Sequence, residues 1–253
     1  MFNQNSHWKP HTLGNSLIRL KNAEIDLWKI DLDVPSKSGL SKISDGDLVR
    51  AKSLRLEQDR RRFLNGRQIF HQILDLYAEH SLGFHLYYDE FNRPLVSNNE
   101  LSVSFSRSGG MAIAAIARGG SLGVDVERLK PLPDLNVAAN SVMASEEYRS
   151  LNRSSGINKL AKFYIAWTAK EAFLKATGQG LIDDLTSISI DLSSVHDYEN
   201  LQNSYELRLT TLPTEHSTDD WQLQHLLWRE EMCVAVAYDQ QFTNVRLFEP
   251  LAD

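Results

Sequence analysis

The sequence is short of several features that would place it in a specialised class. It has one cysteine, Cys233, in 253 residues, which excludes an intramolecular disulfide framework and any metal or redox site built on a CxxC pair. Its apolar runs are short, so we expect no membrane-spanning segment. The first thirty residues lack a basic stretch followed by an apolar one, so we expect no signal peptide and a cytoplasmic location.

Common signatures of nucleotide and zinc-protease sites are also missing. The chain contains no GxxxxGK[ST], GxGxxG or HExxH pattern, and its eight histidines show no ligand spacing with cysteine or carboxylate. What remains is an ordinary globular composition, 42% hydrophobic and 24% charged. A chain of this length buries a sizeable core as one large domain or two small ones.

Charge is distributed unevenly along the chain. The formal net charge is −6, yet the segment 42–67 holds eight basic and four acidic residues, so it is +4 and the rest is −10. One basic stripe on an acidic protein indicates a local anion site. A nucleic-acid-binding surface is not expected, because the protein as a whole is acidic. Arg60–Arg62 point in different directions around a helix, so at most two of them reach one ligand.

Apolar periodicity predicts an α+β chain in which the order "long helix, then strands" occurs twice. The helices are predicted over 59–80 and 158–177, the second ending at Gly178, and a connector with three prolines, 129–140, separates the two sets. The predicted strands are, in chain order, 25–33, 84–88, 101–105, 111–117, 122–127, 187–192, 205–209, 223–228 and 232–238.

This repeated order predicts two similar halves, 1–128 and 129–253, related by a pseudo-twofold axis. Each half would be a long helix packed on a small, mainly antiparallel sheet. The strand 111–117 has a counterpart at 232–238. A site between two such halves would lie in a natural cleft.

Two carboxylates alternate in the segment 123–127. Asp125 and Glu127 are two residues apart on a predicted strand, so they share one face about 7 Å apart, while Val124 and Val126 face the core. Paired carboxylates of this kind suit a hard cation such as Mg²⁺. The alternative is an exposed strand face on which Glu127 pairs with Arg128.

A second charged pair lies on the second long helix. Glu171 and Lys175 are four residues apart, which places them about 6 Å from each other on one helix face. Taken alone, this pair is typical of a solvated face and contributes only about 0.3–0.5 kcal/mol.

Small residues between 104 and 110 form a third candidate element. Serines and glycines after a strand can make a nest of backbone N–H groups that holds an anion, and Arg107 would add charge to it. A turn closed by serine side-chain hydrogen bonds is the alternative.

Together these segments resemble the Sfp-type 4′-phosphopantetheinyl transferases. The matching patterns are FNRP at 91–94, SFSRSG at 104–109, GVDVE at 123–127, WTAKEAFLK at 167–175, GQGL at 178–181 and RLEQDRRRFLNGR at 55–67. Their order and separations fit as well, and the resemblance covers roughly 48–181. The length matches the two-halved, monomeric branch of the family.

The chain departs from the family pattern at one position. The family usually has His in S-H-S-G, where it contacts coenzyme A phosphate, and this chain has Arg107. Arginine is permanently charged and binds phosphate through two N–H groups, so the role can survive with less dependence on pH. Tighter binding and a shifted substrate pose are the two alternatives.

The resemblance implies a Mg²⁺-dependent holo-carrier-protein synthase, with Mn²⁺ as the alternative metal. The serine hydroxyl of an apo acyl or peptidyl carrier protein would attack the β-phosphate of coenzyme A. The carrier would gain 4′-phosphopantetheine, and 3′,5′-ADP would leave. The alternative is a non-catalytic module that binds coenzyme A or a carrier protein.

The resemblance also implies roles for particular residues. Asp125, Glu127 and Glu171 would bind the metal, and Lys175 would neutralise charge on the leaving phosphate. The general base would be Glu171 or a metal-bound water or hydroxide, and the sequence does not choose between them. The carrier would dock beside 129–147. The implied coenzyme A contacts are Arg50, Arg60, Arg67, Arg93, Ser106, Arg107 and Lys175, with Arg50, Arg60 and Arg67 on the 3′-phosphate.

Overall fold

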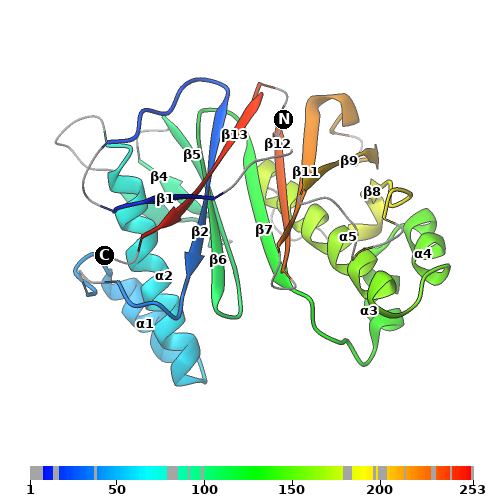
Figure 1. Cartoon of the computed structure of the whole chain (residues 1–253), viewed down its shortest axis with the longest axis horizontal. Helices are drawn as coiled ribbons and strands as arrows, with labels where there is room; N and C mark the ends of the chain where they lie inside the picture. Colours follow the sequence, from blue (N-terminus) through cyan, green and yellow to red (C-terminus); the bar gives the residue numbers. More distant parts are fainter. Residues whose placement is uncertain are drawn as a thin grey trace.

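Two β-sheets form the centre of the molecule, and each carries a long helix on its outer face (Figure 1). The computed structural model describes residues 8–13, 17–36, 39–78, 85–90, 92–97, 100–178, 184–195, 198, 204–213, 215–228, 232–239 and 241–251. In these ranges we find no helix with the length and hydrophobicity that a bilayer crossing needs.

The first sheet has five strands in the order β1-β13-β2-β6-β5. Strand β13 runs parallel to both β1 and β2, whereas β2, β6 and β5 are antiparallel. Its strands are β1 (Lys9–His11), β13 (Asn244–Pro250), β2 (Glu24–Asp31), β6 (Met111–Arg118) and β5 (Leu101–Ser108), and its helices are α1 (Asp45–Ser53) and α2 (Glu57–Asp75). The small hairpin of β3 (Leu86–Tyr88) and β4 (Pro94–Val96) lies beside β5.

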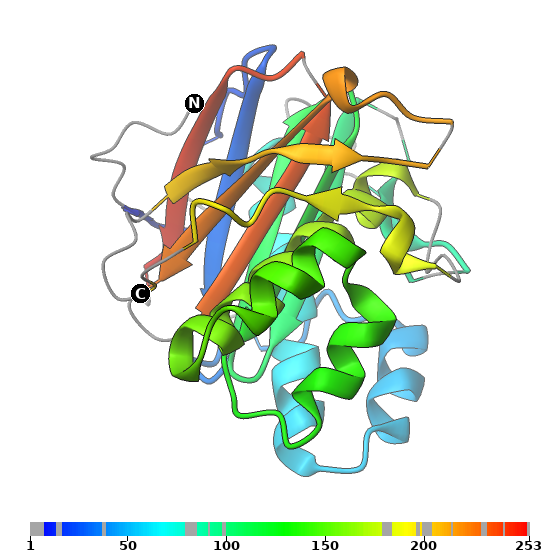
Figure 2. The same cartoon turned by 90° about the vertical axis from the view of Figure 1, so that its right-hand side faces the viewer.

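The second sheet has four antiparallel strands in the order β7-β12-β11-β9. They are β7 (Leu122–Arg128), β12 (Met232–Asp239), β11 (Trp221–Trp228) and β9 (Ser204–Leu207). Helix α5 (Gly156–Thr177) lies across the outer face of this sheet (Figure 2). The other elements of this part are α3 (Leu135–Val142), α4 (Ser145–Asn152), β8 (Ser189–Ile190), β10 (Leu209–Thr211) and two short 3₁₀ turns, Leu185–Ser187 and Thr218–Asp220.

The topology confirms the two similar halves. In the first half, β2 precedes α2 in the chain and then pairs with β6, which pairs with β5. In the second half, β7 precedes α5 and pairs with β12, which pairs with β11. The predicted counterparts 111–117 and 232–238 thus occupy the same place in their sheets. The predicted boundary at residue 128 does not separate the two sheets. Strand β7, which precedes the boundary, belongs to the second sheet, and β13, which follows it, belongs to the first. The division of the chain at this residue therefore stays a prediction.

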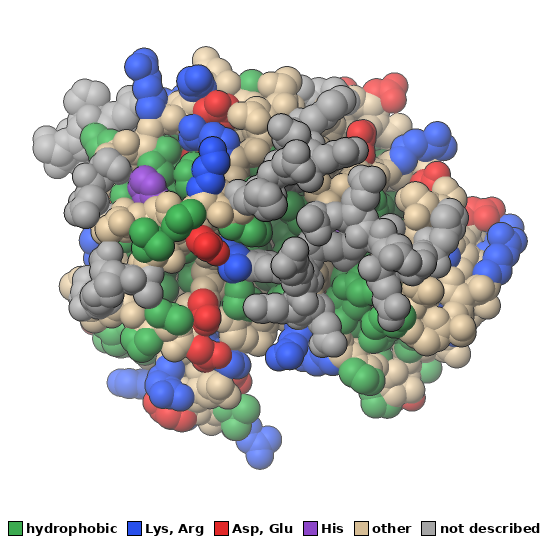
Figure 3. All heavy atoms as spheres, in the orientation of Figure 1, with side chains coloured by type: hydrophobic (Ala, Val, Ile, Leu, Met, Phe, Trp, Pro, Cys, Tyr) green, Lys and Arg blue, Asp and Glu red, His purple; other side chains and the backbone are tan. Residues whose placement is uncertain are grey.

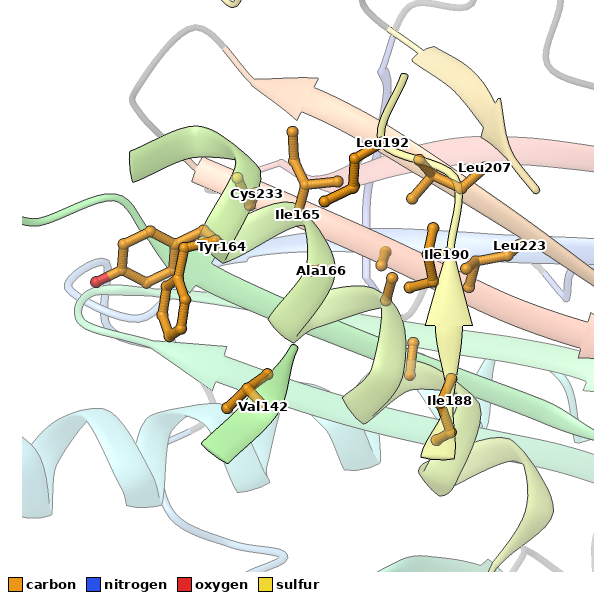
Figure 4. Close-up of a cluster of buried hydrophobic side chains, with 14 of the residues drawn as sticks. Val142, Tyr164, Ile165, Ala166, Ile188, Ile190, Leu192, Leu207, Leu223 and Cys233 are labelled. Carbon is orange, nitrogen blue, oxygen red and sulfur yellow. The ribbon is translucent and has the colours of Figure 1, made fainter. Parts of the chain in front are cut away.

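Three apolar clusters form the core. One lies between α2 and the first sheet, and one between the inner faces of the two sheets. The third lies between α5 and the second sheet, where Ile165 of α5 packs near Cys233, Ile190 and Leu207 (Figure 4). Alternation on β7 follows the prediction, because Val124 and Val126 lie in the inter-sheet cluster, on the face opposite the carboxylates.

Some element boundaries differ from the prediction. Helix α2 ends at Asp75, whereas the periodicity predicted it to His80; residues 79–84 lie outside the described part. Tyr77 keeps its apolar position without a helix, because its hydroxyl lies between Trp28 Nε1 and Asp26, each at 2.7 Å. The predicted connector 129–140 contains the start of α3, and the predicted strand 187–192 is reduced to Ser189–Ile190.

Candidate active site

The inner edge strand β7 presents the two predicted carboxylates on one face. Asp125 is 4% exposed, and Glu127 is half-buried. Both side chains point toward β5, the neighbouring edge strand of the other sheet, since each accepts a hydrogen bond from it. Glu127 therefore does not lie on an exposed strand face paired with Arg128, as the simpler interpretation expected.

Strand β5 carries a serine at every second position. We call these four residues the serine row: Ser102, Ser104, Ser106 and Ser108. Ser104 Oγ accepts from the amide N of Val124 at 3.0 Å. Ser106 Oγ donates to Asp125 Oδ1 at 2.7 Å, and Ser108 Oγ donates to Glu127 Oε2 at 2.6 Å. The two sheets are joined here through side-chain hydroxyls, and the site lies at this junction.

Helix α5 adds the predicted Glu171–Lys175 pair. Lys175 Nζ donates to Asp125 Oδ1 at 2.6 Å and to Ser106 Oγ at 3.1 Å. The helix reaches β7 because Gly123 has no side chain: a Cβ there would lie 2.0 Å from the carbonyl O of Ala172. The helix ends as predicted at Gly178, which takes the left-handed conformation with φ +73°.

Electrostatics in this cluster favour a bound cation. Burial, with Asp125 as the next cause, raises the pKa of Glu171. Burial also raises the pKa of Glu127, against the opposing effect of the Ser108 hydrogen bond. Carboxylates that share a partly buried site repel one another, and a cation placed among them would reverse both effects.

Two buried oxygens in the cluster have no hydrogen-bond partner among the residues that the structure describes: Asp125 Oδ2 and Glu171 Oε1. Orphaned carboxylate oxygens are costly unless something pairs with them. In the described ranges, no three acidic, histidine or cysteine side chains are grouped closely enough to hold a metal ion as they stand. The donor set, all carboxylate oxygen, is the type that Mg²⁺ prefers.

A cavity of about 520 Å³ opens next to this cluster, and Glu171, Lys175 and Arg93 line it with Pro94 and Phe105 among others. Arg93 is held by Asp89, through the arginine Nε at 3.1 Å and the backbone N at 2.8 Å. The cavity therefore brings a guanidinium, an ammonium and a carboxylate to one place.

A second, smaller cavity of about 180 Å³ shares Pro94 and Phe105 with the first and is lined by Arg50, Arg67 and Arg107. The carbon atoms at the centre of these three guanidinium groups lie 5.9, 5.1 and 5.6 Å from the Phe63 ring centroid. Figure 3 shows Lys and Arg side chains at the lower end of the lobe formed by α1 and α2, and at the notch beside it.

In the described part of the chain, an ion pair with a carboxylate is seen for one of these three guanidinium groups. Arg67 is paired with Asp47 at 3.3 Å and lies over the Tyr88 ring, 3.7 Å from its centroid. Burial lowers the pKa of Arg67 and of Arg107. Three like charges in one small cavity, with aromatic faces behind them, form a site for a multiply charged anion.

Most of the predicted site residues come together, and Arg60 does not. Arg60 donates from Nε to the carbonyl of Leu54 at 2.8 Å and pairs with Glu57 at 3.2 Å, and it lines neither cavity. Its role on the 3′-phosphate stays a prediction. Ser106 lines the arginine cavity and touches the carboxylate cluster, so it joins the two parts of the site.

The structure does not show the nest of backbone N–H groups, which was one of the two interpretations of the segment 104–110. Strand β5 continues to Ser108 and pairs with β6 along its whole length, so residues 104–108 are extended and do not form the turn that a nest of successive N–H groups requires. Only Gly109 and Gly110 form the turn. The functional groups of this segment are side chains, with Ser106 and Ser108 on one face of the strand and Arg107 on the other.

Sequence reasoning missed a buried ion pair that supports the site. Lys170 is fully buried, and its Nζ donates to Glu147 Oε2 and to the carbonyl of Val142, both at 2.6 Å, and to the carbonyl of Leu185 at 3.2 Å. Glu147 also accepts from the N–H of Ile190. The pair fastens α5 to its neighbours one residue before Glu171. Lys170, within the segment 167–175, was the sequence feature that could have indicated this pair.

Comparisons with known proteins point to one family. The sequence model described as "4'-phosphopantetheinyl transferase superfamily" matches residues 121–237. The 4′-phosphopantetheinyl transferase HetI of Nostoc is 32% identical over 70% of this chain and 77% of its own. A Synechocystis relative, assigned only provisionally to the same activity, is 29% identical over 78% of this chain and 77% of its own. The 4′-phosphopantetheinyl transferase Sfp of Bacillus subtilis is 30% identical over 51% of this chain and 52% of its own.

Proposed function

Because the chain belongs to the 4′-phosphopantetheinyl transferase superfamily, we propose that Asp125, Glu127 and Glu171 hold the Mg²⁺ of this reaction. The protein transfers 4′-phosphopantetheine from coenzyme A to a carrier protein. The observation that carries the metal assignment is the pair of buried, unpartnered oxygens, Asp125 Oδ2 and Glu171 Oε1. A bound Mg²⁺ would neutralise the pyrophosphate and polarise the phosphate under attack.

The side chains around the cavity then act by position and charge. Lys175 reaches both Asp125 and Ser106, so its ammonium can move to the phosphate oxygen on which negative charge grows as the P–O bond to 3′,5′-ADP breaks. The carrier serine oxygen forms the new bond to the β-phosphorus. Its proton passes to a base, for which Glu171, which lines the same cavity, stays the candidate within the chain.

The arginine cavity supports a place for the remaining phosphate of coenzyme A. Arg50, Arg67 and Arg107 offer several N–H donors around one small space, and the fork of a guanidinium matches phosphate oxygens. Ser106 lies between this cavity and the carboxylates. One molecule can therefore span both parts with its 3′-phosphate and its pyrophosphate.

The carrier would dock beside 129–147, where α3 leaves Val137 67% exposed. An exposed aliphatic side chain on this segment suits a partner that covers it. We further propose a monomer, because both halves of the site belong to one chain. The cytoplasmic location stays a prediction.

A transfer assay with matched variants tests these assignments. With coenzyme A, Mg²⁺ and a panel of apo carriers, the wild-type protein adds one phosphopantetheine to a carrier, measured by mass spectrometry. Asp125→Ala and Glu171→Gln abolish transfer and Mg²⁺ binding while circular dichroism stays unchanged. Wild-type rates in either variant would remove the metal assignment, and light scattering checks the monomer.

A further inference from the structure

The serine row holds the two metal carboxylates differently. Asp125 Oδ1 receives both Ser106 Oγ and Lys175 Nζ. The only hydrogen bond to the Glu127 side chain that the structure shows in its described part comes from Ser108 Oγ, at 2.6 Å. The orientation of the Glu127 carboxylate therefore depends on one hydroxyl.

Ser108 has no freedom in how it makes this hydrogen bond. Its Oγ also accepts from the backbone N–H of Arg128 at 3.1 Å. A hydroxyl has a single proton to donate, and a carboxylate oxygen near it is an acceptor. The proton of Ser108 therefore points at Glu127, and both ends of the hydroxyl are fixed by strand β7.

The way in which the two sheets meet explains why a side chain of β5, and not its backbone, contacts Glu127. Strands β5 and β7 belong to different sheets and share no backbone pairing. The three serines that reach β7 replace that pairing with hydroxyl contacts at every second residue. Ser108 is the last of them and contacts the carboxylate at the far end of the pair.

We propose that Ser108 is a positioning residue for Glu127, which it holds in the orientation that binds Mg²⁺. This inference rests on the metal assignment proposed above. Residues that hydrogen-bond a metal ligand fix its direction, and their loss typically weakens metal affinity by about 10–100-fold. Ser108 itself lines neither cavity, so its effect on coenzyme A should be small.

A titration with Mg²⁺ at saturating coenzyme A, with binding measured by calorimetry, tests this role. We expect Ser108→Ala to weaken Mg²⁺ binding by at least about tenfold, to leave the KM for coenzyme A within about twofold, and to regain most of its rate when Mg²⁺ is raised. Ser108→Thr keeps the hydroxyl and should retain near wild-type affinity.

The matched control is Ser102→Ala in the same strand and row. Ser102 Oγ donates to the carbonyl of Gly120 at 2.5 Å and touches no carboxylate, so its loss should leave Mg²⁺ affinity unchanged. Equal Mg²⁺ affinity in Ser108→Ala and the wild type would overturn the role of Ser108 alone. Failure of the wild type to bind Mg²⁺, or undiminished binding in Asp125→Ala, would instead overturn the metal assignment.

Discussion

Gly123 sets the distance between the strand that carries the carboxylates and the helix that carries Lys175. A Cβ at this position would lie 2.0 Å from the carbonyl O of Ala172 and 2.5 Å from the N of Ala176. Both atoms are backbone of α5, so no side chain can rotate away. Ordinary contact begins at 3.4 Å, so Gly123→Ala must move the helix by about 1.4 Å (3.4 less 2.0).

The displacement falls where it matters for catalysis. Ala172 and Ala176 are each one residue from Glu171 and Lys175 in the chain, so the helix takes both functional side chains with it. The 2.6 Å contact between Lys175 and Asp125 would not survive such a move. A misplacement of about 1 Å can cost on the order of 10²-fold in rate. Overpacking of this kind typically costs about 1–3 kcal/mol of stability.

We therefore expect Gly123→Ala to remain folded. Its Tm should fall by about 2–4 °C for each kcal/mol of lost unfolding free energy, and its kcat/KM should fall by about 10²-fold. Steady-state transfer kinetics and a thermal melt measure the two effects. Gly46→Ala is the matched control, because a Cβ there meets only Ser44 Oγ at 3.7 Å. In helix α1 it should raise stability by up to about 1 kcal/mol and leave the rate unchanged. An unchanged Tm would refute the packing argument, and a lowered Tm with full activity would refute the link to catalysis.

Three further outcomes are expected. Lys170→Met leaves the buried Glu147 without its cation, so chemical denaturation should show a loss of about 3–5 kcal/mol. Adding Glu147→Leu should restore only part of it, because the N–H of Ile190 then loses its acceptor. In Arg107→His, the affinity for coenzyme A should fall as the pH rises from 6 to 8, by about tenfold more than it does in the wild type, because an imidazolium loses its charge above a pKa near 6.5. Calorimetry at the two pH values measures this. Burial lowers the pKa of His225 to about 3. Below pH 6.5 the unfolded chain therefore binds a proton on His225 that the folded chain does not. The free energy of unfolding should fall by about 2 kcal/mol from pH 7.5 to 5 for this reason. If the free energy of unfolding of His225→Leu depended on pH as steeply as that of the wild type, this prediction would be wrong.

The parts of the site that follow local rules could be predicted from the sequence. Alternation placed Asp125 and Glu127 on one face of a strand, and the four-residue spacing placed Glu171 and Lys175 on one face of a helix that ends at Gly178. All of this depends on periods of two and 3.6 residues within single elements. The structure confirms these placements.

What the sequence could not show are contacts that arise between elements. The four serines of β5 alternate as plainly as the carboxylates, yet nothing local says that β5 ends one sheet beside the edge of another. The extent of β5 itself was underestimated, because Ser106–Ser108 have low strand propensity and are kept in the strand by pairing with Ile113–Met111 of β6. Lys170 looked like an ordinary helix residue, and only packing shows that it is buried on Glu147.

The division of charge between the two edges explains why strand register governs this site. Cations that suit a phosphate ester, Arg67 and Arg107 among them, come from the first half. Of the three carboxylates proposed to hold the metal, Asp125 and Glu127 come from β7 of the second sheet and Glu171 comes from α5. Because side chains alternate, a slip of one residue between β7 and β12 would exchange Asp125 for a valine at the site and bury a carboxylate between the sheets. The inter-sheet core rejects that arrangement through Val124 and Val126, both fully buried. The apolar face of β7 therefore fixes the position of its carboxylate face, and the serine row aligns that face with the arginines.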